Sequence, residues 1–255
     1  MRFQDKVAIV TGGAGGIGAA CVRAFAREGA KVVFTDLKDG KAISDECGAD
    51  FFQHDATDET GWIDLVDHVA AKHGRLDVVV NNAGIFRPGS IEDTTVDLFR
   101  EVIDANLLSV MLGCREAVRA MKGNPGGPSG AIVNVSSITG FVGLGPGLAY
   151  TASKGGVRLM SKSVAVHCAR AYPRIRCNSV HPGTVDTPMN QAAWDASGDP
   201  DGMRAFFAQL QPVGRIADAD EMAGAVLFLA SDDASYVTGT ELVVDGGWLA
   251  AAGPL

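Results

Sequence analysis

The sequence predicts an α/β protein whose doubly wound, seven-stranded and mainly parallel sheet carries helices on both faces. Short runs rich in β-branched residues alternate with longer segments in which apolar residues recur at helical spacing. This alternation is typical of parallel strands joined by crossover helices. A glycine-rich stretch follows the first run directly, and the chain has 255 residues, 47% of them hydrophobic. That composition is enough to fill the core of one large domain, residues 1–255.

The predicted strands are separated by segments with helical periodicity. They comprise residues 7–10, 32–35, 50–53, 78–80, 132–135, 175–180 and 242–244. The first helix is expected over residues 17–28 and ends at Gly29, because glycine tolerates the positive φ that often terminates a helix. Residues 124–130, rich in glycine and proline, end a later helix and are too few to separate domains. Residues 250–255 are expected to form a loose or interface-docked tail.

The charge balance argues against polyanionic partners. The formal net charge is −8, so the averaged field repels phosphate backbones and anionic membrane surfaces. We therefore expect neither a nucleic-acid nor a membrane partner. Asp5 and Lys6 precede a short apolar stretch that ends in glycines, so neither a signal peptide nor a transmembrane helix is expected.

The cysteines and histidines do not have the spacing of metal ligands. The five cysteines form no CxxC pair and are odd in number, which favours small core residues in a reducing cytoplasm over a zinc cluster or a disulfide framework. The histidines are scattered and lack the i, i+4 pairing of a helical zinc site. They are His54, His68, His73, His167 and His181. We expect no metal.

The stretch after the first strand, residues 11–18, has glycines at the spacing G-x-x-x-G-x-G. A tight turn from a strand into a helix must bring backbone N–H groups against a pyrophosphate, and a Cβ atom would intrude there. The spacing alone is a weak signal in a chain with 32 glycines. Its position between a strand and a helix makes it a candidate dinucleotide site.

Asp36 lies at the end of the second strand. It follows the glycine motif at close to the separation of about 20 residues at which an acidic residue binds the adenosine ribose. A carboxylate there accepts hydrogen bonds from both ribose hydroxyls and repels a 2′-phosphate. Lys38 would attract such a phosphate, but no basic residue interrupts the glycine turn. The sequence therefore favours NAD over NADP. The alternative for Asp36 is an ordinary carboxylate at a strand end, exposed to water and without a ligand.

Polar residues also follow the third and fourth strands. Asp55 comes after the third strand, and Asn81-Asn82-Ala83-Gly84 after the fourth. Open α/β sheets bind ligands at the carboxyl ends of their strands. Asparagine and glycine are also common in turns. Taken alone, each segment is therefore as consistent with an ordinary turn as with a binding site.

Tyr150 and Lys154 are four residues apart at the beginning of a long helical segment, so both side chains project from one helix face. A phenol ionises near pH ~10, whereas a nearby ammonium and a cationic nicotinamide ring favour the phenolate. We therefore expect Lys154 to lower the pKa of Tyr150. Ser137, at the end of the fifth strand, is placed to hydrogen-bond the reacting oxygen; a turn serine is the alternative.

With these residues in place, the chain resembles the short-chain dehydrogenase/reductase family along nearly its whole length, from residues 6–12 to residues 244–247. TGxxxGxG, NNAG, the serine, YxxxK and Pro-Gly followed by Thr-Pro occur in the family's order and approximate spacing. Residues 51–55, 136–143 and 180–183 look most like bacterial NAD-dependent secondary-alcohol dehydrogenases, with cyclic-alcohol and hydroxysteroid dehydrogenases close behind. The resemblance implies a single Rossmann-type domain.

The resemblance also implies roles. Ser137 orients the substrate oxygen, Tyr150 is the general acid/base, and Lys154 binds the nicotinamide ribose while lowering the Tyr150 pKa. Asn106 matches the family asparagine that supports a water in the proton relay. Cofactor contacts are implied at Gly12, Gly16, Ile17, Gly18, Asp36, Leu37, Asp55, Ala56, Asn82, Ala83, Gly84, Tyr150, Lys154, Pro182, Gly183, Val185 and Thr187.

Two segments are expected to cover the nicotinamide, residues 138–148 and residues 188–211. Their apolar side chains suit a small hydrophobic alcohol or ketone better than a sugar or a charged acid, although each alone is more often a packing residue. They are Phe141, Val142, Leu144, Met189, Trp194, Phe206 and Phe207, joined by Phe86.

Two rival functions stay open. A 3-oxoacyl-thioester reductase uses the same serine, tyrosine and lysine, but would favour NADPH and a basic patch, contrary to Asp36 and the net charge. A nucleotide sensor without turnover would keep the fold, yet it would not need an intact Ser137, Tyr150 and Lys154. In the family, helices like those after Thr95 and Tyr150 pair between subunits, which implies a homotetramer.

Overall fold

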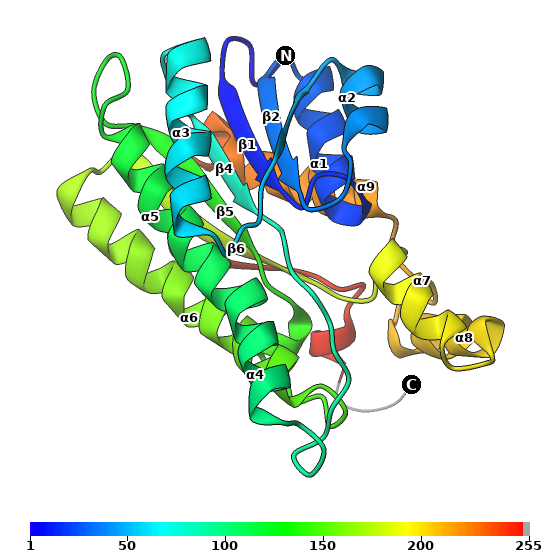
Figure 1. Ribbon diagram of the computed structural model, residues 1–255. Helices are drawn as coiled ribbons and strands as arrows, with labels where there is room; N and C mark the ends of the chain where they lie inside the picture. The colour runs from blue at the N-terminus through cyan, green and yellow to red at the C-terminus, as the bar shows by residue number, and fades with distance from the viewer. Residues whose placement is uncertain (252–255) are drawn as a thin grey trace.

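Seven parallel strands form the central sheet of the protein, here a computed structural model that describes residues 1–251 (Figure 1). The strands are β1 Val7–Thr11, β2 Lys31–Asp36, β3 Asp50–Gln53, β4 Val78–Asn81, β5 Gly130–Val135, β6 Ile175–Pro182 and β7 Glu241–Val244. Their order across the sheet is β3-β2-β1-β4-β5-β6-β7, and each neighbouring pair is parallel. All seven predicted strands are confirmed, with ends that extend by one or two residues at most.

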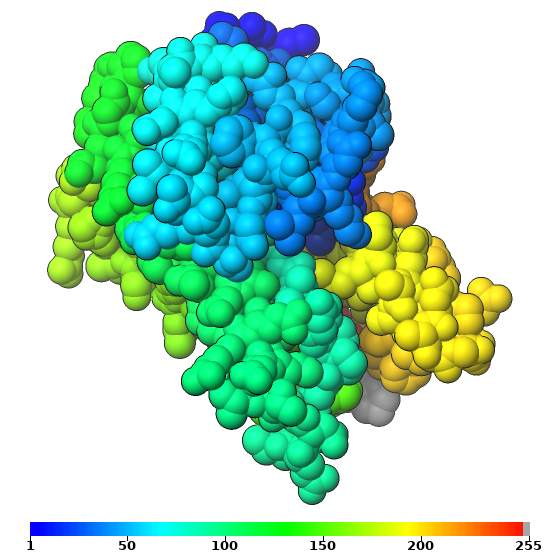
Figure 2. Space-filling view, viewed as in Figure 1, coloured from blue at the N-terminus to red at the C-terminus, as the bar shows by residue number. Residues whose placement is uncertain are grey.

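Helices cover both faces of this sheet, which confirms the doubly wound prediction. They are α1 Gly16–Arg27, α2 Lys41–Cys47, α3 Glu59–His73, α4 Val96–Ile103, α5 Ser109–Met121, α6 Leu148–Ala171, α7 Pro188–Asp195, α8 Pro200–Leu210 and α9 Ala219–Ala230. One face packs against α1, α2 and α9, and the other against α3, α5 and α6 (Figure 1). Helices α7 and α8 stand out from the body of the molecule (Figure 2).

The alternation of side chains along each strand divides the core into two layers. In β1, Ala8 and Val10 pack with α1 and α9, whereas Val7 and Ile9 pack with α3 and α5. All five β1 residues are buried, because helices cover both of its faces. Burying one such aliphatic side chain contributes about 1.5–3 kcal/mol. The core therefore fixes β1 and the turn that follows it.

The chain order reverses between β1 and β4, which lie side by side in the sheet. At such a switch point the loops leave the carboxyl ends of neighbouring strands in opposite directions and open a crevice. The glycine turn follows β1, and Asn82 follows β4, so both predicted motifs lie at this point.

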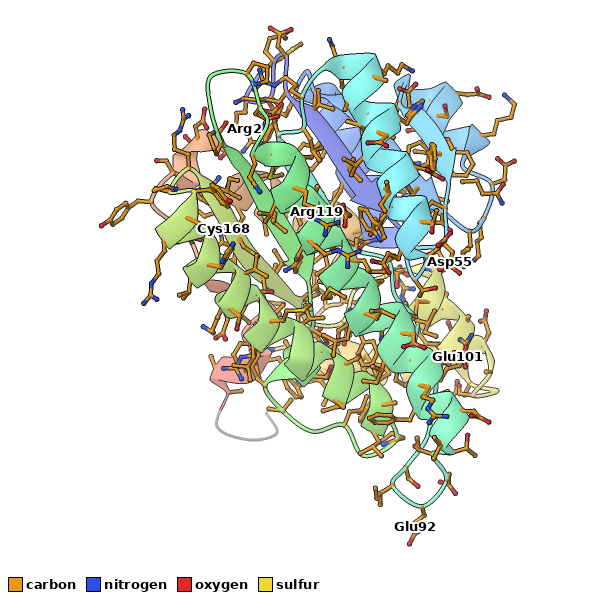
Figure 3. The ribbon with its side chains drawn as sticks, turned by 60° about the vertical axis from the view of Figure 1, so that its left-hand side comes forward. Arg2, Asp55, Glu92, Glu101, Arg119 and Cys168 are labelled. Atoms are coloured by element: carbon orange, nitrogen blue, oxygen red, sulfur yellow. The ribbon has the colours of Figure 1, made fainter. Side chains whose placement is uncertain are left out.

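Helices α4 and α5 are joined by a π-helical turn, Asp104–Leu108, and run on as one rod from Glu101 towards Arg119 (Figure 3). The sequence analysis did not foresee this turn. Across residues 1–251, no helix combines the length and the hydropathy that a bilayer crossing requires. Of the tail expected at residues 250–255, residues 252–255 lie outside the described part of the chain.

Candidate active site

The glycine turn between β1 and α1 has no room for side chains at Gly12 and Gly18. A Cβ atom at Gly18 would lie 2.0 Å from the Gly12 carbonyl oxygen, and one at Gly12 would lie 2.9 Å from Asn82 Nδ2. Gly12 and Gly16 have φ of +66° and +53°, which side chains disfavour. Within residues 1–251, no side chain caps the beginning of α1. Its first N–H groups and its positive dipole end are therefore available to an anion.

Asp36 is fixed against this turn by two backbone amides. Ala14 N donates to Asp36 Oδ2 at 3.1 Å, and Lys38 N donates to Oδ1 at 3.0 Å. Each carboxylate oxygen can accept a further hydrogen bond. Leu37 beside it is 66% exposed. The end of β2 therefore presents a held carboxylate and an apolar side chain next to the glycine turn.

The end of β3 carries the predicted pair Asp55 and Ala56. Asp55 Oδ1 accepts hydrogen bonds from the amide and the hydroxyl of Thr57, at 2.9 and 2.8 Å. The carbonyl of buried Ala56 accepts from Trp62 Nε1 at 2.9 Å. Figure 3 shows Asp55 beside the beginning of α3, at the same edge of the sheet.

Thr11 joins the ends of β1 and β4. Its hydroxyl oxygen accepts from the amides of Asn82 and Ala83, both at 3.0 Å. Asn82 Nδ2 in turn donates to the carbonyls of Thr11 and Gly12, at 3.0 and 3.2 Å. The sequence analysis gave Thr11 no role of its own, because a threonine at a strand end has no distinguishing signal.

Gly84 connects the nucleotide end to the chemical end. A Cβ atom there would lie 2.9 Å from Asn106 Oδ1 and 3.6 Å from Lys154 Nζ. Asn106 is fully buried in the π-helical turn. Asn106 Oδ1 accepts from the Ile85 amide at 2.7 Å. Its Nδ2 donates to the Ile85 carbonyl at 2.9 Å and to Ser153 Oγ at 3.1 Å.

Tyr150 and Lys154 lie on α6, as predicted. Lys154 is 4% exposed, and its Nζ donates to the Val135 carbonyl at 3.0 Å and lies 5.6 Å from the centre of the Tyr150 ring. Phe86 packs edge-on against Tyr150, with ring centres 5.4 Å apart. The structure therefore brings the phenol, the ammonium and the end of β5 together.

The pKa values differ from the sequence expectation. Burial raises the pKa of Tyr150 above its usual value, and a hydrogen bond with the Ser137 hydroxyl opposes this. Burial also lowers the pKa of Lys154 to about 8. The sequence predicts that Lys154 and a bound nicotinamide ring lower the Tyr150 pKa; among the protein's own groups the net shift is upward, because desolvation disfavours the phenolate and the ammonium alike.

The loop after β6 lies across the glycine turn. A Cβ atom at Gly183 would lie 2.8 Å from Asp245 Cα, and one at Gly16 would lie 3.3 Å from the Thr187 methyl. Val185 pairs with Ala217. The remaining predicted residue of this loop, Pro182, ends β6. The loop therefore closes over the beginning of α1.

The apolar side chains predicted to line one pocket fall into separate groups. Trp194 and Phe207 pack together on α7 and α8, with ring centres 6.1 Å apart, and Phe206 packs on Phe207 at 5.4 Å. Phe86 lies against Tyr150. Phe141, by contrast, packs against His181, with ring centres 4.7 Å apart. It therefore does not join the aromatic group on α7 and α8.

Two further residues escaped the sequence analysis. Gln211, buried at the end of α8, accepts a hydrogen bond from Thr184 N at 3.0 Å and so connects α8 to the loop after β6. His181, which was weighed only as a metal ligand, bonds the Ser137 carbonyl. In residues 1–251, His, Cys, Asp and Glu side chains form no group of three or more arranged for a metal.

The fold and the order of these residues define a Rossmann-type α/β protein, which a solved structure supports. The ligand-free aldohexose dehydrogenase of Thermoplasma acidophilum superposes with a TM-score of 0.90 at 35% sequence identity, over 98% of this chain and 96% of that one. The predicted fold class is confirmed.

The chain belongs to the short-chain dehydrogenase/reductase family of oxidoreductases. Residues 12–249 match the family model described as Enoyl-(Acyl carrier protein) reductase. An NADP-dependent (R)-specific alcohol dehydrogenase of Lentilactobacillus kefiri is 42% identical over 98% of both chains. A cyclopentanol dehydrogenase of Comamonas sp. is 43% identical over 98% of this chain and 99% of its own. The resemblance to bacterial alcohol and cyclic-alcohol dehydrogenases is confirmed.

Proposed function

We propose that the protein is an NAD-dependent dehydrogenase that moves hydride between the nicotinamide ring and a small hydrophobic secondary alcohol or ketone. One observation carries this proposal: the segment after β4 meets the glycine turn through Asn82, whose Nδ2 donates to the Gly12 carbonyl at 3.2 Å, and lies against Asn106 and Lys154 at Gly84. A dinucleotide held at the turn would therefore direct its reactive end towards Tyr150. We place the whole reaction in one domain, residues 1–255.

The residues at the crevice fit a dinucleotide. The glycine turn excludes side chains, and the uncapped N-terminus of α1 offers N–H donors, which suits a pyrophosphate. Asp36 would accept from the adenosine ribose, Asp55 and Ala56 would flank the adenine, and Lys154 would bind the second ribose. When bound, the nicotinamide ring supplies the hydride acceptor or donor.

Tyr150 is the proposed general acid/base. In the oxidative direction its oxygen takes the proton of the substrate hydroxyl, and in the reductive direction it returns one to the carbonyl oxygen. The Ser137 hydroxyl would hydrogen-bond the reacting oxygen of the substrate and orient it. The ammonium of Lys154, 5.6 Å from the centre of the Tyr150 ring, would favour the phenolate against the burial that raises the Tyr150 pKa, and the Lys154 pKa of about 8 leaves it mostly charged at neutral pH. Asn106 anchors this side of the crevice and would support the proton relay.

Asp36 supports NAD as the cofactor. Two backbone amides hold its carboxylate beside the turn, where a 2′-phosphate would meet a fixed negative charge. The Lentilactobacillus kefiri relative is named NADP-dependent, so similarity to relatives does not by itself support NAD. We attribute the choice in this chain to Asp36.

The proposed substrate is a small hydrophobic alcohol or ketone, covered by residues 188–211. Trp194 and Phe207 form an apolar group on the two helices of this segment, and Phe86 lies on the Tyr150 ring. Aromatic walls around one polar reacting centre are typical of pockets for apolar ligands. Relatives named as alcohol and cyclopentanol dehydrogenases support this choice.

The second candidate is a 3-oxoacyl-thioester reductase; the description of the family model also names a thioester on an acyl carrier protein, but an enoyl one. The chain's net charge of −8 disfavours docking of an acidic carrier protein. A nucleotide sensor without turnover is the remaining alternative.

A cofactor and substrate panel separates these functions. NADH absorbance would be followed with linear, cyclic, aromatic and steroid alcohols, and with a 3-oxoacyl thioester in the reductive direction. We expect turnover with hydrophobic secondary alcohols and NAD. Turnover with the thioester and NADPH alone would establish the second candidate, and NADH binding without turnover on any compound would establish the sensor.

We further propose a cytoplasmic homotetramer. Val96 and Phe99 on α4 and Leu159 and Val166 on α6 are exposed, and burying such apolar faces between subunits would stabilise an oligomer. The five cysteines carry free thiols in the described structure, which suits a reducing compartment. Light scattering at several protein concentrations would test the tetramer, and a mass of one subunit throughout would refute it.

A further inference from the structure

A buried histidine lies directly behind the proposed catalytic serine. His181 is fully buried near the end of β6. His181 Nδ1 lies 3.0 Å from the carbonyl oxygen of Ser137, and Nε2 lies 2.8 Å from Ser179 Oγ. Ser179 and His181 are two residues apart on one strand, so their side chains project to the same face of the sheet. That face carries α6, with Tyr150 and Lys154.

The partners of the imidazole fix its protonation. A carbonyl oxygen can only accept, so Nδ1 must donate to Ser137. Burial lowers the pKa of His181, which keeps the ring neutral. Nε2 then accepts from the Ser179 hydroxyl at 2.8 Å, a shorter contact than the 3.3 Å from that hydroxyl to the Thr240 carbonyl oxygen. The charged groups that face the ring are Arg158 and Lys154 from α6 and Glu241 from β7. Glu241 favours a positive charge on the imidazole, whereas burial, Arg158 and Lys154 oppose it.

His181 also supports the segment that follows Ser137. The turn Ile138–Gly140 begins at Ser137, and Phe141 comes directly after it. The Phe141 ring packs against His181 with centres 4.7 Å apart, and the guanidinium carbon of Arg158 lies 4.0 Å from the Phe141 ring centre. Arg158 is held in turn by Glu241, with Nε 2.7 Å from Oε1. The turn is therefore fixed at both of its ends.

We propose that His181 is a positioning residue that keeps Ser137 in register with Tyr150, by donating from Nδ1 to the Ser137 carbonyl and packing against Phe141. This inference rests on the proposed catalytic roles of Ser137 and Tyr150. His181 faces the backbone of Ser137 and acts through it. Small displacements of an orienting group lower turnover strongly, on the order of 100-fold for about 1 Å.

Three variants separate positioning from space filling. His181→Leu removes the donor at similar volume, whereas His181→Asn keeps an N–H donor at the distance of Nδ1 from the main chain. Ser179→Ala removes the hydrogen bond to Nε2 and releases the constraint on the ring's proton. His68→Asn, on the exposed surface of α3, is the matched control and should behave as the wild type.

The assay uses the full chain with NAD and the best alcohol of the panel, over a range of pH. We expect His181→Leu to lower kcat by about 10- to 100-fold, with the NADH Kd within about twofold of wild type. The pH limb assigned to Tyr150 should move to higher pH, because the Ser137 hydrogen bond lowers that pKa. His181→Asn should restore most of kcat and most of the pH limb's position. Ser179→Ala should give values between those of the wild type and His181→Leu.

Unchanged kcat and an unchanged pH limb in folded His181→Leu would overturn the inference. So would a His181→Asn variant no better than His181→Leu, since the ring would then only fill space. If His181→Leu does not fold, wild-type behaviour of Ser179→Ala decides against the inference. An active Tyr150→Phe would refute the proposed function itself, whereas an inactive Tyr150→Phe beside a fully active His181→Leu would remove only the role of His181.

Discussion

The two halves of the crevice are built in different ways. In the nucleotide half, the turn from β1 to α1 lies within residues 11–18 and leaves no room for a Cβ atom at Gly18, while Asp36 and Asn82 attach to it through hydrogen bonds with its backbone. The chemical half is assembled from side chains of five separate segments, after β4, in the π-helical turn, after β5, on α6 and at the end of β6. Backbone geometry determines the first half, and packing between elements determines the second.

This comparison predicts that the two halves can be damaged independently. The largest effect is expected in the chemical half. Tyr150→Phe removes the proton donor and acceptor and keeps the ring that packs on Phe86. We expect kcat to fall by roughly 10²- to 10⁴-fold, the contribution of general acid–base catalysis, with NADH affinity nearly unchanged in a fluorescence titration. Near-normal turnover would contradict the role of Tyr150.

The next effect should be confined to the nucleotide half. Gly18→Ala forces a methyl group to within 2.0 Å of the Gly12 carbonyl oxygen, so we expect NADH binding to weaken by about 10- to 100-fold, as a few kcal/mol of overpacking implies. Calorimetry would measure both the Kd and the Tm. At Gly224 on α9, a methyl group would meet no atom of the described chain within 4 Å. Gly224→Ala should therefore bind NADH normally, and equal loss in both variants would disprove the steric argument.

A smaller effect within the nucleotide half tests charge instead of shape. Asp36→Ala should raise the NAD Michaelis constant by about tenfold, since a hydrogen bond to a charged group contributes about 1.5–3 kcal/mol. Discrimination against NADP should relax, because the fixed negative charge is gone. Steady-state kinetics with both cofactors would measure this. Asp39→Ala, which removes a nearby exposed carboxylate that accepts from Lys41 N, is the control. Unaltered selectivity in Asp36→Ala would show that Asp36 does not determine the choice of cofactor.

The smallest effect lies outside both halves. Hydrogen bonds from Arg215 and the Asp218 amide lower the pKa of Glu221 to about 2 from its usual 4.5. In that interval the unfolded chain binds more protons, so this contribution to stability is present above pH 4.5 and is lost as the pH falls towards 2. Glu221→Gln should lower the Tm modestly at neutral pH and converge with wild type in acid. Parallel Tm curves at every pH would contradict this, and turnover should not change.

Tertiary packing produced the features of the chemical half that the sequence analysis missed. The four-residue spacing of Tyr150 and Lys154 placed them correctly on one helix face, since helical periodicity needs no knowledge of neighbours. Their pKa values were not predictable in the same way. The degree of burial depends on what surrounds α6, and desolvation reversed the direction expected for Tyr150. Phe141, predicted to line the substrate pocket, likewise packs against His181 and Arg158.

The sequence by itself determined the parallel sheet, the glycine turn and the acid at the end of β2, because each follows from local periodicity or from the steric demands of a backbone. Only the tertiary structure decided the π-helical turn that buries Asn106, the contact of Gly84 with both Asn106 and Lys154, and the bond between His181 and Ser137. Those three depend on segments far apart in the chain. Their distances are set by how helices pack on a sheet, and residue spacing carries no record of that packing.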